Sequence, residues 1–349
     1  MLPPLFQQID LQCTGDQLHE FLHQIQQRSQ EAERSINRSG SKDDQVQNLK
    51  SAVDARFVEL PEVLDFLRKC EECGRQTIFL LEPKNDEVKN RLQDATTIAT
   101  ELFGEEWGPD YFPIHERPVE GIQWVDCRVK IPGHPRDWCL KAYGHEVIEE
   151  TIENKREEID ERHFRDIRDV EILDVNTVAV VRWRDPHFLE VRVDKLRSSG
   201  FNEMRNRLAS IGQMLSPAIN IQTECVSYSL QDSLRRLIDG RRAQAADKTV
   251  YRVTSIKFLD RREGSNELRP MMAGEDVDSD VGRTESIEAL MKNGAKPSRV
   301  ALEWLDGEWA PDSLPDSLST TVEGDSCDAV SIASRVTPEV LDYVINKLR

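Results

Sequence analysis

The sequence predicts an α+β protein of two domains, each a small, mostly antiparallel sheet flanked by helices, joined by a long charged helix. Three observations predict this class. The chain has 349 residues, more than a single hydrophobic core usually serves. Short strand-like runs and amphipathic helical patterns occur in both halves of the chain. Between them, residues 145–168 are highly charged and carry a narrow apolar stripe at helical spacing, which predicts the connecting helix.

The predicted N-terminal domain covers residues 1–144. Thr14 or Asp16 can cap its first helix, and Gly74 can end its second. The segment QTIFLLEP is apolar without interruption and predicts a buried strand. The elements follow as helix 14–35, helix 60–73, strand QTIFLLEP, helix 86–103, and the strands GIQWVDCRVKIP and DWCLKAY.

The predicted C-terminal domain covers residues 169–305. The segments EILDVNTVAVVRW and FLEVRVDKL, with Pro186 between them, have the pattern of a β-hairpin. Flanking helices and two further strands complete an α+β layout. These elements are helices 199–214 and 227–242, strand TVYRVTSIKFLDR, helix 284–292 and strand RVALEWL.

The last part of the chain predicts a tethered helix. Residues 306–336 form an expected acidic, flexible linker, because 306–328 hold seven acids and no lysine or arginine. In residues 337–349, Thr337 can cap a helix that begins with Pro338. Its apolar face must dock, either on the chain's own core or on a partner, since so short a helix is marginal alone. This face consists of Val340, Leu341, Val344, Ile345 and Leu348.

Composition limits the classes of protein. The net charge is -18, with 38% apolar and 32% charged residues. No run approaches the 18 apolar residues that span a bilayer, and the start resembles no signal peptide. Seven scattered cysteines fit reduced thiols better than a disulfide framework. We therefore expect a cytoplasmic protein that does not enter membranes.

The charge is unevenly distributed along the chain. Residues 181–262 carry 16 lysines and arginines against nine acids, a net charge of +7. These cations predict an exposed contact surface for a protein or, alternatively, for nucleic-acid phosphates, unless they pair with acids of the same chain. The surface would contain Arg182, Arg184, Arg192, Lys195, Arg197, Arg205, Arg207, Arg235, Arg236, Arg241 and Arg242.

Two patterns raise the alternative of a metal-dependent hydrolase. HEFLH matches the zinc peptidase motif, with His19 and His23 as ligands and Glu20 as the base, but helical geometry places both histidines beside the apolar face, toward solvent. A nuclease could use Asp174 and Glu190, although Arg192 stands where such sites want a lysine. Strand periodicity instead predicts Glu190 in a solvated row of alternating charges.

In the C-terminal half of this chain, the strand VAVVRWRD, a second strand, a helix and then the helix SYSLQDSLRRLI resemble the centromere protein N family. The similarity covers about a third of the chain and carries no invariant motif, so it identifies no site residue. It implies a protein that binds partners and is associated with nucleosomes or DNA.

These observations predict a non-catalytic interaction or regulatory protein that works within a macromolecular complex. Its expected contact surfaces are the basic central surface and the C-terminal helix. The expected partner is a protein, with nucleic acid as an alternative, and no cofactor is expected. The alternatives are the metal-dependent hydrolase and a protein that binds nucleic acid directly.

Overall fold

The computed structural model describes most of the chain. The described residues are 4–28, 32, 36–105, 107, 120–131, 136–160, 163–185, 188–195, 200–243, 250–259, 264–272, 274–305, 318–324 and 326–349. For residues 146, 148–154, 156–160, 163, 164, 166, 167, 171, 173–175 and 239–243 the backbone alone is described.

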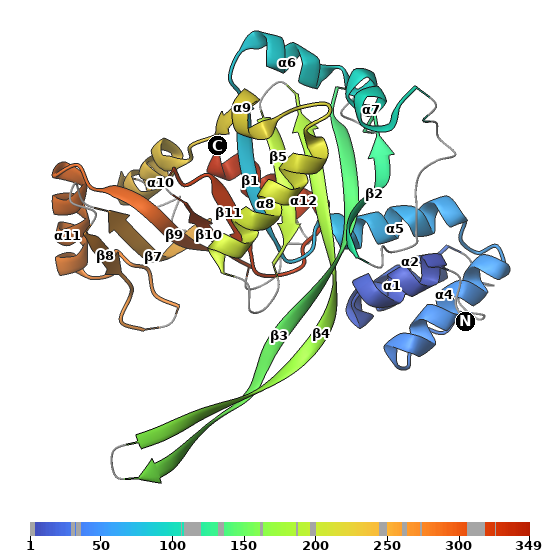
Figure 1. The fold of residues 1–349 in the computed structure, drawn as a ribbon, viewed down its shortest axis with the longest axis horizontal. Helices are drawn as coiled ribbons and strands as arrows, with labels where there is room; N and C mark the ends of the chain where they lie inside the picture. Colours follow the sequence, from blue (N-terminus) through green and yellow to red (C-terminus); the bar gives the residue numbers. More distant parts are fainter. Residues whose placement is uncertain are drawn as a thin grey trace.

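Eleven described strands form one sheet (Figure 1), and the pairings between them are antiparallel. The strands are β1 (Gln76–Pro83), β2 (Gly121–Arg128), β3 (Trp138–Asp160), β4 (His163–Arg184), β5 (Phe188–Asp194), β6 (Cys225–Ser227), β7 (Tyr251–Leu259), β8 (Ser265–Leu268), β9 (Lys296–Trp304), β10 (Leu318–Glu323) and β11 (Ala329–Ile332). Their order is β2-β3-β4-β5-β1-β11-β10-β9-β7-β8, and β6 pairs with β1.

Helices surround this sheet. They are α1 (Pro4–Gln12), α2 (Gly15–Gln26), α4 (Lys42–Asp54), α5 (Leu60–Glu72), α6 (Asp86–Gln93), α7 (Ala95–Phe103), α8 (Phe201–Leu215), α9 (Ile221–Glu224), α10 (Gln231–Ala243), α11 (Val281–Lys292) and α12 (Pro338–Leu348). The predicted helix over 86–103 is divided into α6 and α7 because Asp94 accepts from the backbone N–H of Thr97 and starts a new helix.

Strand β1 lies in the middle of the sheet and is buried on both faces. Its side chains alternate between two cores, as the strand period requires. Ile78 and Leu80 belong to the core that α10 and α12 complete. Phe79 and Leu81 belong to the core on the opposite face, which α6, α7 and α8 complete. The uninterrupted apolar run in QTIFLLEP is therefore explained by its central position.

The first four described helices form a separate apolar core. Helices α1, α2, α4 and α5 pack their apolar stripes together, with Ile9, Leu18, Leu22 and Leu49 fully buried. Helix α4 is absent from the predicted elements, because polar residues dominate the segment in which it begins. Its signal is a capping box in which Ser41 accepts from the Asp44 backbone N–H and Asp44 accepts from the Ser41 backbone N–H.

The predicted connecting helix over 145–168 is wrong. These residues belong to the long strands β3 and β4, which pair with each other from Trp138↔Trp183 out to Asp160↔His163. The outer part of this hairpin projects from the body (Figure 1). Glutamate, lysine and arginine favour helices by intrinsic propensity, which made the charged segment resemble one.

The α+β class is confirmed, but the division into two separate sheets is not. The boundary at residue 144 falls inside β3, and β1 from the expected first domain pairs with β5 and β11 from the expected second domain and linker. The expected linker 306–336 contains β10 and β11, so this part of it is an ordered component of the sheet. Its residues 306–317 lie outside the described part of the chain.

Candidate functional site

The charged segment RWRDPHFLEVRVDKLR, residues 182–197 of the sequence, contributes side chains to a buried ion-pair network. Glu190 of β5 is fully buried, and Arg192 donates to its Oε2 from Nε at 3.0 Å and from Nη2 at 2.5 Å. Arg184 of β4 pairs with the other carboxylate oxygen. Arg192 also donates to the backbone carbonyl of Glu72 at the end of α5. The prediction of a solvated row is therefore wrong for Glu190 and Arg192, because helices cover this face of the sheet.

The terminal helix takes part in the same network. Asp342 of α12 accepts from Arg184 and lies 3.9 Å from Arg182. Arg182 also pairs with Asp137 at 2.9 Å. The side chains of Arg182, Arg184 and Arg192 are only 14%, 11% and 4% exposed. Arg184 thus links Glu190 of β5 to Asp342 of α12, and the three arginines do not form an exposed basic surface.

The network fixes the protonation of Glu190. Burial raises the pKa of this carboxyl group, but the guanidinium groups of Arg192, Arg184 and Arg182 more than offset that effect and lower the pKa to about 2. A sealed carboxylate with so low a pKa is a poor proton acceptor at neutral pH. The chemistry of Glu190 is therefore structural, and this residue does not suit the general-base role of a nuclease.

The remaining predicted cations are dispersed. Arg205 pairs with Asp328 at 3.3 Å, and Arg207 donates to the backbone carbonyl of Asp194 at 2.7 Å. Lys195 is half-buried at the end of β5. These side chains therefore do not form one continuous basic surface, and two of them, Arg205 and Arg207, bind acceptors of the same chain.

Helix α10 carries the last group of predicted cations. Arg235 and Arg236 are exposed on it, and Arg236 donates to the backbone carbonyl of Arg349 at 2.8 Å. Arg197 lies outside the described residues, as do the side chains of Arg241 and Arg242. Arg235 and Arg236 of α10 are thus the exposed residues among the described cations of the predicted surface.

The apolar face of the terminal helix is docked on the chain's own core. The helix itself is confirmed as Pro338–Leu348, with Thr337 as its cap. Its five predicted contact residues are each at most 1% exposed and belong to the core beneath α10 and β1. Docking in the same molecule, one of the two sequence-based alternatives, is therefore what the structure shows. These residues are Val340, Leu341, Val344, Ile345 and Leu348.

The HEFLH segment lies on α2 and does not gather zinc ligands. His19 Nδ1 is 3.1 Å from the Arg38 carbonyl, and His23 Nε2 is 3.0 Å from Gln27 Nε2. Glu20 accepts from Gln24 on its own helix. Within the described residues, no group of three or more His, Cys, Asp or Glu side chains is placed to hold a metal ion. The predicted apolar face of this helix is confirmed, since Leu18 and Leu22 are fully buried.

The two acids of the nuclease alternative lie far apart. Glu190 pairs in register with Arg182 of β4, whereas Asp174 lies opposite Val147, eight residues farther along β4 from Arg182. At the strand rise this separates the two backbones by about 26 Å. Two carboxylates this far apart cannot share a magnesium ion.

The outer hairpin of β3 and β4 is the feature that the sequence prediction missed. Strand β2 pairs with β3 as far as His145, and β5 pairs with β4 from Ala179 onward. Beyond these points, in residues 146–160 and 163–176, the described pairings are those of the two strands with each other. We call residues 146–176 the arm. At the strand rise its strands extend about 50 Å.

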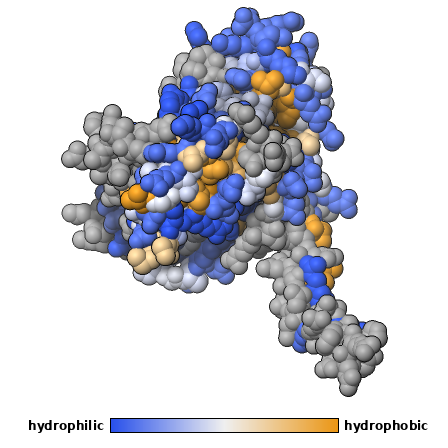
Figure 2. All heavy atoms as spheres, turned by 90° about the vertical axis from the view of Figure 1, so that its left-hand side faces the viewer, coloured by the Kyte–Doolittle hydropathy of each residue, from blue (hydrophilic) through white to orange (hydrophobic). Residues whose placement is uncertain are grey.

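The arm exposes apolar side chains on one face. Ile172 is 68% exposed, Val147 61% and Val170 40%. Positions 170, 172 and 174 share a face by the strand period, and Val147 lies opposite position 174, so all three apolar residues share that face. Apolar atoms are visible on the part of the arm next to the body (Figure 2).

The arm is also strongly acidic. It holds 12 aspartates and glutamates against five lysines and arginines, a net charge of -7. Lys155 and Asp169 pair across the strands at 3.6 Å, with both side chains half exposed. A usable signal for the arm was present in the sequence, because the strand predicted from residue 171 onward required a partner as long as itself.

Comparison with known proteins does not place the chain in a family. No protein-family model matches it, and no curated protein matches its sequence. The resemblance to the centromere protein N family therefore stays a prediction. Among the described residues, no helix combines the length and the apolar character needed to cross a membrane.

Proposed function

We propose that this chain is a non-catalytic interaction protein that works within a macromolecular complex, and that the arm is its principal contact element. The partner is a protein with a basic surface. The seven cysteines are free thiols, which supports a cytoplasmic location. The observation that carries the proposal is the projection of a two-stranded hairpin, with exposed apolar side chains, beyond every described neighbour in the sheet.

Stability arguments support a contact role for the arm. A two-stranded hairpin is marginally stable alone in water, and burying its apolar face would contribute about 25 cal/mol for each Å² removed from water. Val147, Val170 and Ile172 provide that face. Both outer edges of the arm also carry backbone groups that pair with no described strand, and such edges readily accept another strand.

The charge of the arm supports a basic protein over nucleic acid as its partner. A net charge of -7 repels phosphates and attracts lysine and arginine side chains. The cations on which the nucleic-acid alternative depended are partly internal, since Arg182, Arg184 and Arg192 are paired inside the protein. Direct nucleic-acid binding is therefore the less favoured proposal.

The test compares complexes recovered with the whole chain and with an arm-shortened chain. The shortened chain joins Val147 to Asp174, which lie opposite each other, through an Asn-Gly turn. A second variant, Val170→Ser with Ile172→Ser, keeps the arm but removes apolar surface. Val281→Ser is the matched control, because Val281 is 75% exposed on α11 at the other end of the sheet. Each chain is tagged, isolated from its native cells, and its co-purifying proteins are quantified by mass spectrometry.

We expect the same partners with the whole chain and the Val281→Ser control, and their loss with both arm variants. Circular dichroism of the purified chains checks that all four are folded. An unchanged set of partners after shortening of the arm would remove the proposal. Recovery of DNA or RNA by the whole chain, with loss of that recovery on Arg235→Ala and Arg236→Ala substitution, would favour the nucleic-acid alternative.

A further inference from the structure

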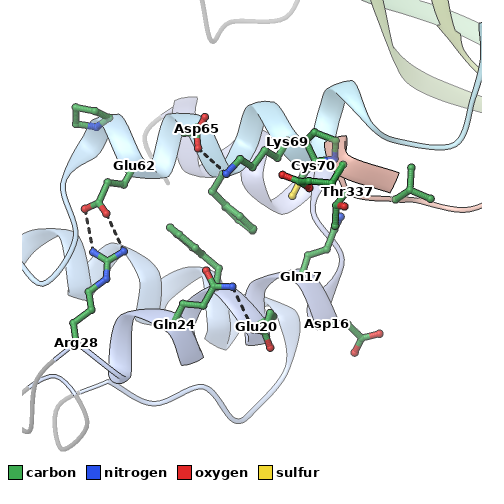
Figure 3. Close-up of a pocket in the computed structure, with 16 residues that line it drawn as sticks. Asp16, Gln17, Glu20, Gln24, Arg28, Glu62, Asp65, Lys69, Cys70 and Thr337 are labelled. Atoms are coloured by element: carbon green, nitrogen blue, oxygen red, sulfur yellow. Dashed lines mark hydrogen bonds and ion pairs between the residues drawn. The ribbon is translucent and has the colours of Figure 1, made fainter. Parts of the chain in front are cut away.

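A groove of about 790 Å³ lies between α2, α5 and the start of α12. The order of the labelled residues in Figure 3 shows α2 and α5 running antiparallel on its two sides. Arg28 and Glu62 form an ion pair at 2.8 Å at one end. Thr337, the cap of α12, lies at the other end. The groove is thus an elongated channel bounded by three helices.

The walls of the groove are helical stripes. On α2 the lining positions include Gln17, Glu20 and Gln24, and on α5 they include Asp65 and Lys69. These spacings of three and four residues place successive side chains along one line of each helix. Two antiparallel stripes leave space for a third rod between them, which is the geometry of a helix bound in a groove.

The floor of the groove is aromatic. Phe21 of α2 and Phe66 of α5 stack with their ring centroids 4.2 Å apart and their planes at 3°. Val336 and Pro338 add apolar surface where α12 begins. Phe21 is only 9% exposed, because most of its side chain packs in the helical core. The remaining surface of Phe21 lines the groove together with Phe66. Such a floor fits aliphatic side chains of an incoming segment.

The rim of the groove is acidic. Glu62 pairs with Arg28, and Asp65 pairs with Lys69 at 3.0 Å. Within each of these two pairs, the positive and the negative charge cancel. Three more carboxylates, those of Asp16, Glu20 and Glu339, line the groove and have no ion pair with any described residue. The groove therefore carries a net charge of about -3 around an apolar floor, which complements a cationic amphipathic segment.

We propose that this groove binds an amphipathic helix of a partner protein, with aliphatic side chains on the Phe21–Phe66 floor and lysine or arginine side chains at the acidic rim. The proposal is independent of the arm, because no residue of the arm lines the groove. A phosphate-bearing ligand fits poorly, since the cations beside the floor, Arg28 and Lys69, are already paired.

Defined peptides test the groove directly on the full chain. The probe is a labelled 16-residue helical peptide with leucines at helical spacing and flanking lysines. A second peptide has the same composition in an order that destroys the stripe, and a third has glutamates in place of the lysines. Binding is followed by fluorescence anisotropy at low and moderate salt. We expect the first peptide to bind, more weakly at higher salt, and the other two to bind at least about tenfold more weakly.

Two variants locate the binding. Gln24→Trp fills the groove from α2, and we expect it to weaken binding of the first peptide more than about tenfold. Gln47→Trp, an equal enlargement of an exposed glutamine on α4 outside the groove, is its control and should leave binding unchanged. Neutralising Asp16, Glu20 and Glu339 together should weaken binding about tenfold at low salt. Glu285→Gln on α11 is the matched control for a lost carboxylate.

Three results of the peptide measurements would overturn the inference. The first is absence of binding by the lysine peptide at millimolar concentration. The second is equal binding of the reordered peptide, and the third is equal weakening by Gln24→Trp and Gln47→Trp. The alternative occupant of the groove is a second copy of this chain, and analytical sedimentation tests for it. A dimer that Gln24→Trp dissociates would assign the groove to that second copy and reject the partner helix.

Discussion

At the scale of single residues, Glu190 determines whether the charged face of β5 is stable. Its carboxylate is fully buried and shared by the guanidinium groups of Arg184 and Arg192. Burying three charges is costly unless each is paired, and removing one partner leaves the others desolvated without compensation. The stability of the region where β4, β5, α5 and α12 meet therefore depends on one acid.

We predict that Glu190→Gln lowers the free energy of unfolding by about 3 to 5 kcal/mol, because it leaves the buried Arg192 without its carboxylate partner and Arg184 with Asp342 alone. Urea denaturation followed by circular dichroism measures the change. Asp65→Asn is the control, since the Asp65–Lys69 pair is more than half exposed on both sides and should change stability by less than about 1 kcal/mol. Equal effects of the two substitutions would show that the buried network is not a stability determinant.

The same carboxylate predicts a pH dependence. The pKa of Glu190 falls from an ordinary value of 4.5 to about 2, so its ionised form stabilises the fold. The contribution, about 3 kcal/mol, is complete above pH 4.5 and is lost as the pH falls from 4.5 toward 2. We expect the difference in unfolding free energy between the parent chain and Glu190→Gln to shrink over that interval. A difference that stays constant from pH 7 to pH 3 would contradict the assignment.

At the scale of elements, the sequence predicts best where burial imposes a period. Helix α5 and the strands β1 and β5 lie within a few residues of their predicted positions, because their apolar residues face defined cores. No described helix or strand packs against the face of the projecting arm (Figure 1), so no second layer imposes such a period on it. The intrinsic propensity of its charged residues therefore predicts a helix. In the fold, pairing between the two strands overrides that propensity.

The candidate site was harder to predict for a related reason. Period two correctly separated Glu190 and Arg192 from the apolar residues of β5, but alternation does not reveal what covers the second face. Helices α5 and α12 come from segments far away in the sequence and provide that cover. The groove beside Phe66 was inaccessible to prediction for the same reason, since its three helices meet only in the folded chain.

Helix α12 yields a prediction about stability. Removing residues 337–349 deprives the core of five side chains, each worth about 1.5 to 3 kcal/mol of burial, a total close to the whole stability of a typical domain. We expect the truncated chain to lose its cooperative thermal transition and to aggregate. Asn346→Ala, at an exposed position of the same helix, should change stability by less than about 0.5 kcal/mol. A truncated chain that melts like the parent would contradict the cis docking.

At the scale of the whole molecule, the sheet joins the parts of the chain that the sequence separated. Strand β1 has β5 on one side and β11 on the other, so segments near the start, middle and end of the chain meet at its centre. Both cores include side chains of β1. The sheet can therefore be completed only when nearly the full chain is present.

We predict that fragments 1–144 and 145–349 do not fold separately into the parent structure. The cut passes through β3 and separates β1 from the strands that pair with it, β5, β6 and β11. Each fragment should lack a cooperative urea transition in its strand signal, although α1, α2, α4 and α5 retain a core of their own. Two independent, cooperative strand transitions would instead support separate domains.

The central place of β1 has a consequence for how the protein is made. The ribosome releases β1 early, whereas the strand that closes its far side, β11, is among the last segments to emerge. At bacterial to eukaryotic synthesis rates the interval is about 10 to 50 s. During that time the nascent chain carries an apolar strand with an unfilled edge, which makes it a natural client for chaperones that shield such strands.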